Sequence, residues 1–284
     1  MDPLKVTRIG EWLPDFSVIL LGALLSYAAA PGPLIAIFAA FLFATSSYFI
    51  INDYFDAPYD RFKKNNTNPI AKGKLSKGAA LGLAAASLAI AFSIVYFLLP
   101  SFILHLFLAS MTISFLYSAK PFRFKERFLI DVATHGAMGS VVILIGYLLF
   151  APADSMIALF SLLMFIFSVV QALYGEIRDF AYDKKAGFRN TVCTLGIRNS
   201  ILLVIVLYAA SILLFALITY LYFPLYVFAT LVPVAVYLNF LVKTYRSPRI
   251  NGAAFIARDK KIRFLLVIGF SIVFLHLLWI NLAG

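Results

Sequence analysis

The sequence is poor in the residues that build redox and zinc sites. It has one cysteine, Cys193, and three histidines, His105, His135 and His276, in 284 residues. A single cysteine excludes an internal disulfide framework and a metal–thiolate cluster, and the wide spacing of the histidines does not fit a zinc site. Charged residues are also scarce, at 13% of the chain. Redox and zinc chemistry are therefore not indicated, and the position of each charge becomes informative.

Hydrophobic residues are correspondingly abundant. They make up 63% of the chain, and the mean hydropathy of +0.94 lies far outside soluble globular usage. A helix needs about 20 apolar residues to cross the hydrocarbon core of a bilayer. Nine runs approach this length, which predicts an all-α polytopic protein with nine transmembrane helices. The runs cover residues 13–30, 33–51, 79–99, 101–118, 128–150, 155–176, 199–221, 223–243 and 263–282.

The first run also resembles a cleavable signal peptide, because it ends in three alanines at 28–30. However, Asp15 interrupts its approach, Pro31 would follow the cut, and another apolar run begins at once. We therefore expect the first run to be kept as a membrane helix.

Lys and Arg residues lie in alternate connections between the expected helices. With the N-terminus inside, the inner side holds 2 of them before the first helix and 6, 4, 5 and 7 in the even-numbered loops or at the helix ends that border them, which is all 24. Since these residues accumulate in cytoplasmic loops, we expect a multi-pass protein of the cell membrane with a cytoplasmic N-terminus. Most of the formal charge of +11 then faces anionic headgroups or an anionic substrate in the bilayer. There is no soluble basic domain for nucleic acid, and no protein partner is indicated.

Acidic residues form two clusters on the same side, each at the end of an even-numbered helix. Separations of three, four and seven residues place such side chains on one helical face. Each cluster alone fits a solvated helix end with ion pairs, but two clusters on two helices favour a binding site. The clusters are Asn52, Asp53, Asp56 and Asp60, and Glu176, Asp179 and Asp183.

Carboxylate oxygens near hydrocarbon need a compensating positive charge. Hard oxygen donors without sulfur suit Mg²⁺, which binds through one or two carboxylates together with substrate phosphates. Neighbouring Lys and Arg side chains would then hold phosphate oxygens. A Mg²⁺–diphosphate head at the mouth of an apolar bundle indicates a substrate with an apolar tail, and polyprenyl diphosphates fit this description.

Four stretches carry a resemblance to a known family. "NDYFDAPYD" at 52–60 resembles the NDxxDxxxD signature of the UbiA superfamily of intramembrane prenyltransferases, and "DFAYD" at 179–183 resembles its second motif, DxxxD. "YSAKPFRFK" at 117–125 and "DKKAGFRNT" at 183–191 are similar to two further family segments. The resemblance covers all three long basic loops and the nine-helix topology.

The resemblance implies a single prenyltransferase domain over residues 1–284, in which nine helices surround a central cavity with its active site at the cytoplasmic face. It further implies a Mg²⁺-dependent transferase that moves a prenyl group from a polyprenyl diphosphate, such as geranylgeranyl diphosphate, to a hydrophobic or interfacial acceptor. Candidate acceptors are the aromatic ring of a quinone precursor, geranylgeranylglyceryl phosphate and a carotenoid. The enzyme would thus serve lipid or quinone biosynthesis.

Site residues follow from the family pattern. Asp56, Asp183 and Tyr117 are expected to be catalytic, Tyr117 by turning its π face to an allylic cation. The expected Mg²⁺ ligands are Asp53, Asp56, Asp60, Asp179 and Asp183. The expected diphosphate-binding residues are Asn52, Lys72, Lys74, Arg123, Lys125, Arg178 and Lys184.

Several points stay open in the sequence. Pro58 falls inside the first motif and favours a kink, which leaves the placement of Asp60 open. Asn68 precedes Pro69 where many quinone-type and archaeal-lipid members place an arginine. Asp131 and His135 lie four residues apart and fit either an acceptor-binding pair or a helix-packing hydrogen bond.

Polar residues also precede the second motif in the sequence. Gln171, Tyr174 and Arg178 recur at three and four residues, which predicts a shared face leading down from that motif.

Two other classes of membrane protein, one of enzymes and one of transporters, also place charged residues within a helix bundle. A CDP-alcohol phosphotransferase would need a DGxxAR stretch, which the sequence lacks. A transporter would place its charges near the midplane on broken helices, whereas these acids gather at one mouth.

Overall fold

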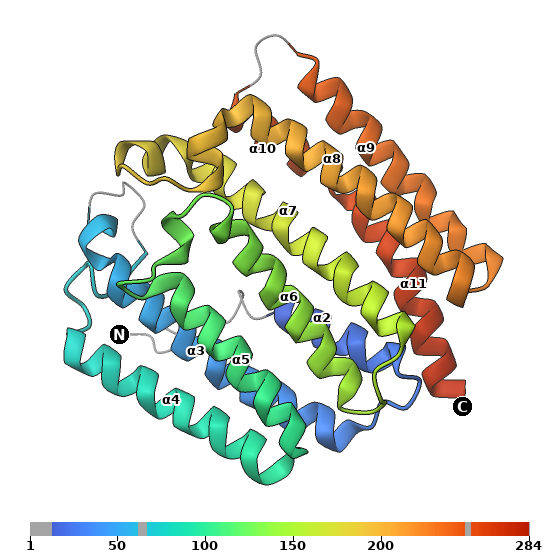
Figure 1. The fold of residues 1–284 in the computed structure, drawn as a ribbon, viewed down its shortest axis with the longest axis horizontal. Helices are drawn as coiled ribbons and strands as arrows, with labels where there is room; N and C mark the ends of the chain where they lie inside the picture. Colours follow the sequence, from blue (N-terminus) through green and yellow to red (C-terminus); the bar gives the residue numbers. More distant parts are fainter. Residues whose placement is uncertain (1–12, 62–66, 248–250, 284) are drawn as a thin grey trace. The chain divides into compact units, whose positions relative to one another are not determined.

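A computed structural model describes residues 13–61, 67–247 and 251–283, and within these ranges the chain is helical with no β-strand (Figure 1). The chain divides into two compact units. Unit 1 runs to Lys125 and includes Val141–Pro152, and unit 2 contains Glu126–Ser140 and the chain from Ala153.

Unit 1 is built on helices α2 (Leu13–Leu25), α3 (Pro31–Asp60), α4 (Lys77–Leu98) and α5 (Ser101–Ser118). Helix α3 begins with proline in its first turn, where the missing N–H costs nothing, and Ser76 caps α4 by accepting from Ala79 N. Helix α3 packs along α4 and α5. The core includes Phe41 of α3 and Phe107 of α5, whose rings meet edge to face at 6.0 Å.

Helix α6 (Ile130–Leu148) contributes its C-terminal half to unit 1. There it approaches α2 so closely that a Cβ on Gly22 or Gly146 would collide with the backbone of the other helix at Ile143 or Ile19. Small residues allow this kind of close helix packing in a membrane protein.

Unit 2 contains helices α7 (Ser155–Lys185), α8 (Thr191–Tyr222), α9 (Leu231–Tyr245), α10 (Gly252–Ile262) and α11 (Phe264–Ala283), with the N-terminal half of α6. Side chains cap three of these helices: Asp154 for α7, Asn190 for α8 and Asn251 for α10. Helix α7 packs along α8 over a core that includes Leu173 and Val204. Two short 3₁₀ helices, Phe124–Glu126 and Leu225–Thr230, lie in connections.

The expected apolar segments coincide well with the observed helices. Eight helical stretches in the described residues are long and apolar enough to cross a membrane, and they match the eight expected segments from 33–51 onward. The first expected segment, 13–30, forms a shorter helix of 13 residues. The nine-helix count and the orientation of the N-terminus therefore stay predictions.

Helical structure extends beyond the expected apolar segments in two ways. Helix α10 lies in a connection that was expected to be a loop, because its 11 residues are too polar for a membrane segment. Helices α3 and α7 continue past their apolar segments as far as Asp60 and Lys185. Both acidic motifs therefore lie on helices.

Candidate active site

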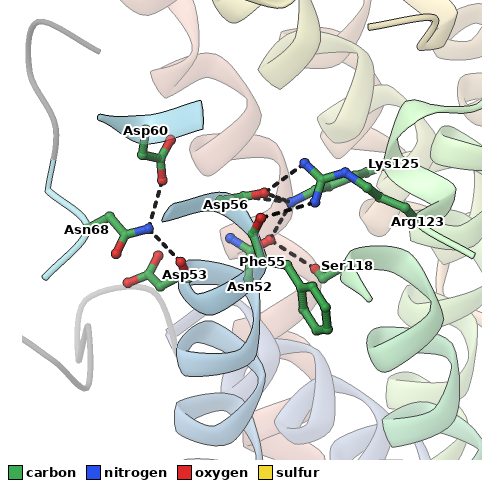
Figure 2. A network of polar contacts seen from close by, with 9 residues as sticks. All are labelled: Asn52, Asp53, Phe55, Asp56, Asp60, Asn68, Ser118, Arg123 and Lys125. Atoms are coloured by element: carbon green, nitrogen blue, oxygen red, sulfur yellow. Dashed lines mark hydrogen bonds and ion pairs between the residues drawn. The ribbon is translucent and has the colours of Figure 1, made fainter. Parts of the chain in front are cut away.

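The first acidic motif presents two neighbouring faces at the end of α3. Figure 2 shows that Asp56 points toward Arg123 and Lys125, whereas Asp60 points toward Asn68. Asn52 lies one turn before Asp56 and shares its face, while residues 53 and 60 are two turns apart and share the other. Helix α3 continues through Pro58, so Asp60 belongs to the same helix as the other three. The motif is thus split between two environments.

Lys125 gathers the polar groups of the first face. Its Nζ donates to Asn52 Oδ1 at 2.8 Å and lies 2.6 Å from each carboxylate oxygen of Asp56. Ser118, at the end of α5, donates to the same Asn52 oxygen at 2.9 Å. The Lys125 and Asp56 side chains are 11% and 17% exposed, which strengthens their charge-assisted hydrogen bonds.

Arg123 forms the second cationic contact of Asp56. Its Nη2 donates to Asp56 Oδ1 at 3.1 Å, and its guanidinium lies 4.7 Å from the centre of the Tyr59 ring. The residue is buried despite its charge. The structure therefore brings together Asn52, Asp56, Arg123 and Lys125, four of the residues expected from the sequence, and adds Ser118, which the sequence analysis missed.

Asn68 organises the second face. Its Nδ2 donates to Asp53 O at 2.7 Å and to Asp60 Oδ2 at 3.0 Å, and its Oδ1 accepts from the N–H groups of Ile70 and Ala71. Asn68 is 1% exposed, so these bonds form away from water. A residue that the sequence marked as a departure from the family pattern thus fastens the loop after α3 to the motif.

The remaining predicted residues of unit 1 lie around this cluster. Tyr117 is half-buried on the last turn of α5, directly before Ser118. Lys72 and Lys74 are exposed on the turn after Pro69, and neither contacts the acids in the part of the chain that the structure describes. The structure does not bring these two lysines into the cluster.

An apolar cavity of about 370 Å³ lies between α3, α4 and α5. Tyr48 and Ser114 line it, and these residues lie one helical turn before Asn52 and Ser118 respectively. The cavity therefore lies along α3 and α5, one helical turn from the polar cluster. Its position and size fit an apolar ligand segment attached to a polar head.

The second acidic motif lies in unit 2 on the last turns of α7. Asp183 is buried and accepts from Asn190 Nδ2 at 2.9 Å, while Asn190 also caps α8. Asp179 pairs with its neighbour Arg178 at 3.1 Å on the exposed side of the helix. Lys184 is exposed, with its Nζ 5.5 Å from the centre of the Phe180 ring.

Two further carboxylates hold the start of α8. Asp131 accepts from the backbone N–H and the hydroxyl of Thr191, and Glu176 accepts from Val192 N at 3.0 Å. The first N–H groups of a helix have no partner within it and carry partial positive charge, so carboxylates stabilise this end. Asp131 thus joins α6 to α8 through hydrogen bonds. This contact corresponds to the helix-packing role that the sequence left open for Asp131.

Gln171, Tyr174 and Arg178 lie on one face of the unbroken helix α7, as their spacing predicts, but their burial differs along that face. Gln171 and Arg178 are exposed, but Tyr174 is buried and its hydroxyl lies 2.8 Å from that of Tyr237 on α9. Tyr237 in turn donates to Asp259 of α10, which also accepts from Arg263. Long helices in unit 2 turn one side to its core, and the sequence pattern alone did not show which side.

The donor set of the first face suits a hard metal ion. No group of three His, Cys, Asp or Glu side chains able to hold a metal occurs within the described ranges. The Asn52 amide oxygen and both Asp56 oxygens nevertheless converge on one point, where Lys125 Nζ lies. Oxygen ligands of this kind are those that Mg²⁺ accepts while it keeps waters and substrate phosphates.

Comparison with known proteins identifies the family. The sequence model of the UbiA prenyltransferase family matches residues 16–267. The chain belongs to the UbiA prenyltransferase family. No curated protein sequence gives a match.

Solved structures share the UbiA fold. A UbiA homolog from Archaeoglobus fulgidus bound to GPP and Mg²⁺ is 19% identical, with a TM-score of 0.72 over 95% of this chain and 98% of that chain. A digeranylgeranylglyceryl phosphate synthase is 17% identical, with a TM-score of 0.75 over 95% and 96%. A UbiA homolog from Aeropyrum pernix K1 is 19% identical, with a TM-score of 0.72 over 94% and 99%. At these identities the likeness shows the fold.

Proposed function

We propose that this UbiA family member is a Mg²⁺-dependent intramembrane prenyltransferase that uses a polyprenyl diphosphate as donor. The observation that carries the proposal is the cluster of Asn52, Asp56, Arg123 and Lys125 beside an apolar cavity. Oxygen donors, cations and an apolar slot are the three elements that a metal-bound diphosphate with a prenyl tail requires.

The metal is assigned to the oxygen donors of the two motifs. In unit 1 these are Asn52 and Asp56 on one face and Asp53 and Asp60 on the other. Bound Mg²⁺ would supply Lewis-acid stabilisation of the negative charge that develops on the departing diphosphate. The UbiA homolog structures with GPP or DMAPP also contain Mg²⁺, which supports this choice of metal.

The cations of unit 1 bind the diphosphate in this scheme. Arg123 offers a planar fork of N–H donors that matches phosphate oxygens, and Lys125 offers a point charge on a flexible stem. Both hold negative charge as the allylic C–O bond breaks. Lys72 and Lys74 are proposed as further diphosphate contacts.

The apolar cavity receives the prenyl tail and keeps water from the allylic cation. Tyr117, directly before Ser118 on α5, is proposed to face that cation with its ring. The acceptor then attacks the cationic carbon. We propose a lipophilic or interfacial acceptor, namely an aromatic quinone precursor, geranylgeranylglyceryl phosphate or a carotenoid.

The second motif provides the remaining residues of the proposal. Asp179 and Asp183 are the further Mg²⁺ ligands, and Arg178 and Lys184 are further diphosphate contacts. Units 1 and 2 then form one prenyltransferase domain over residues 1–284, which the family match across both units supports. We place this site at the cytoplasmic face, because the Lys and Arg residues gather in the loops beside both motifs.

A turnover assay tests the proposal. Purified protein in detergent should consume geranylgeranyl diphosphate with Mg²⁺, and EDTA should stop the reaction. Asp56→Asn and Asp183→Asn should each lower the rate at least 100-fold, about 2.7 kcal/mol of transition-state stabilisation, while the helical circular dichroism is retained. Near-normal rates in either variant would contradict the two-motif mechanism.

A further inference from the structure

Lys125 lies where a metal ion would bind to the first motif. Its Nζ is 2.8 Å from Asn52 Oδ1 and 2.6 Å from both Asp56 oxygens, so three oxygen atoms converge on one positive charge (Figure 2). Mg²⁺ takes the same kind of oxygen atoms, at about 2.0–2.1 Å. An ammonium group and Mg²⁺ cannot both fill this point, because they need the same lone pairs and repel each other.

The two cations beside Asp56 differ in how firmly they are held. The Arg123 guanidinium lies over the Tyr59 ring, and its Nη1 also reaches Phe55 O at 3.5 Å. Lys125 carries its charge on a flexible four-carbon stem, and its Nζ contacts the oxygens of Asn52 and Asp56. Lys125 is therefore the side chain that can leave, and Arg123 the one that stays.

We propose that Lys125 and Mg²⁺ compete for the oxygens of Asn52 and Asp56, and that a diphosphate group ends the competition by offering Lys125 its phosphate oxygens. The inference rests on the proposed function, since it assigns both ligands to the same site. Metal alone must break the hydrogen bonds between Lys125 and the motif. Metal with diphosphate replaces them, because the ammonium gains new anionic partners.

The consequence is positive coupling between metal and diphosphate. Each ligand should tighten the other by the same factor, and coupling of this type is typically about 5- to 150-fold. Lys125 would thus act as a positioning residue that makes tight metal binding conditional on the presence of the diphosphate head.

Binding of Mn²⁺ to the full-length protein in detergent tests the competition directly. Mn²⁺ uses the same oxygen ligands as Mg²⁺, and its electron paramagnetic resonance signal distinguishes bound from free ion. Without diphosphate, Lys125→Met should bind Mn²⁺ about 5-fold or more tightly than the unmodified protein. Adding Asp56→Asn to this variant should remove the gain, which assigns it to the site.

Lys120→Met is the matched control. Lys120 lies in the same connection and loses the same charge, but it is exposed, and its Nζ lies 5.8 Å from the centre of the Tyr59 ring. Its removal should change Mn²⁺ affinity much less, since exposed charges are screened. An affinity in Lys125→Met no tighter than in Lys120→Met overturns the proposal.

A measurement on the unmodified protein covers the case in which Lys125→Met does not fold. Acetic anhydride labels accessible lysines, and mass spectrometry compares Lys125 with Lys120. Saturating Mg²⁺ alone should raise the labelling of Lys125, and added inorganic diphosphate should lower it again. Unchanged labelling with Mg²⁺ alone contradicts the competition.

These outcomes separate the inference from the proposed function. Prenyl transfer that needs Mg²⁺, without tighter Mn²⁺ binding in Lys125→Met, refutes the competition alone. Coupled binding of metal and diphosphate without prenyl transfer refutes the proposed reaction alone.

Discussion

Asn68 shows how a single buried side chain fixes a loop beside an acidic motif. It satisfies two acceptors on α3 and two N–H donors of its own loop. In the sequence this residue is one asparagine in a polar stretch, because nothing local shows that the loop returns to Asp53 and Asp60. The acidic residues were predictable from the sequence as a candidate site, because carboxylates at the end of an apolar run are rare and cost free energy. Their individual hydrogen-bond partners were not.

Replacement of Asn68 by alanine should destabilise the protein. The change removes the Asn68 hydrogen bonds to Asp53 O, to Asp60 and to the Ile70 and Ala71 amides, and a buried polar group left unsatisfied costs about 1–3 kcal/mol. We expect a lower midpoint of unfolding in detergent by circular dichroism. Thr67→Ala, at the exposed neighbouring position, should leave the midpoint unchanged. Equal midpoints for the two variants would show that Asn68 does not hold the loop.

Helix α8 depends on a glycine for the geometry of its first turn. Gly196 has φ 77° and ψ 161°, which breaks the helix after a short initial segment. The N–H groups of that segment meet Asp131, Glu176 and Asn190. Because this backbone region is essentially restricted to glycine, Gly196 lets the segment turn toward the second motif.

Gly196→Ala should therefore cost about 1–3 kcal/mol of folding free energy through backbone strain. No atom lies within 4 Å of the added Cβ, so steric contact would not explain a loss. Gly82→Ala is the matched control: its Cβ also meets open space, but it lies inside α4 and should gain up to about 1 kcal/mol of helix propensity. Thermal unfolding that moves in the same direction for both variants would contradict this account.

The cavity between α3, α4 and α5 allows a second test with a matched pair of residues. Ala85 lines it, whereas Ala86, on the same turn of α4, does not, and both residues are exposed. Ala85→Trp should fill the cavity and raise KM for geranylgeranyl diphosphate more than for geranyl diphosphate, because the longer tail needs more of the space. Ala86→Trp should affect neither. An equal fold-change in KM for both donors in Ala85→Trp, relative to the unmodified protein, would place the tail elsewhere.

Most of the helices were predictable from the sequence, but α10 was not. Eight apolar segments appear at the expected places, because an apolar run of about 20 residues has few alternatives to a membrane helix. The amphipathic α10 was missed, although Asn251 provides an N-cap signal before it. Its buried Asp259 pairs with Tyr237 and Arg263, and such long-range partners leave no local pattern in the sequence.

At the scale of the whole molecule, the distribution of charge predicts how the chain crosses the membrane. All 24 Lys and Arg residues fall before the first expected segment, in the even-numbered connections or at the segment ends that border them, on the same side as both acidic motifs. The prediction concerns which connections face the cytoplasm. It follows from the preference of Lys and Arg for that side.

Single cysteines test this orientation, because the chain has one native cysteine to remove. In a Cys193→Ala background, Lys74→Cys and Lys260→Cys should react with a membrane-impermeant maleimide in inside-out vesicles and be protected in right-side-out vesicles. Ala153→Cys, in the connection between α6 and α7, should show the reverse. All three positions are exposed, so accessibility within the protein does not limit the reaction. Labelling of all three from one side would contradict the predicted topology, because an odd number of crossings separates position 153 from the other two.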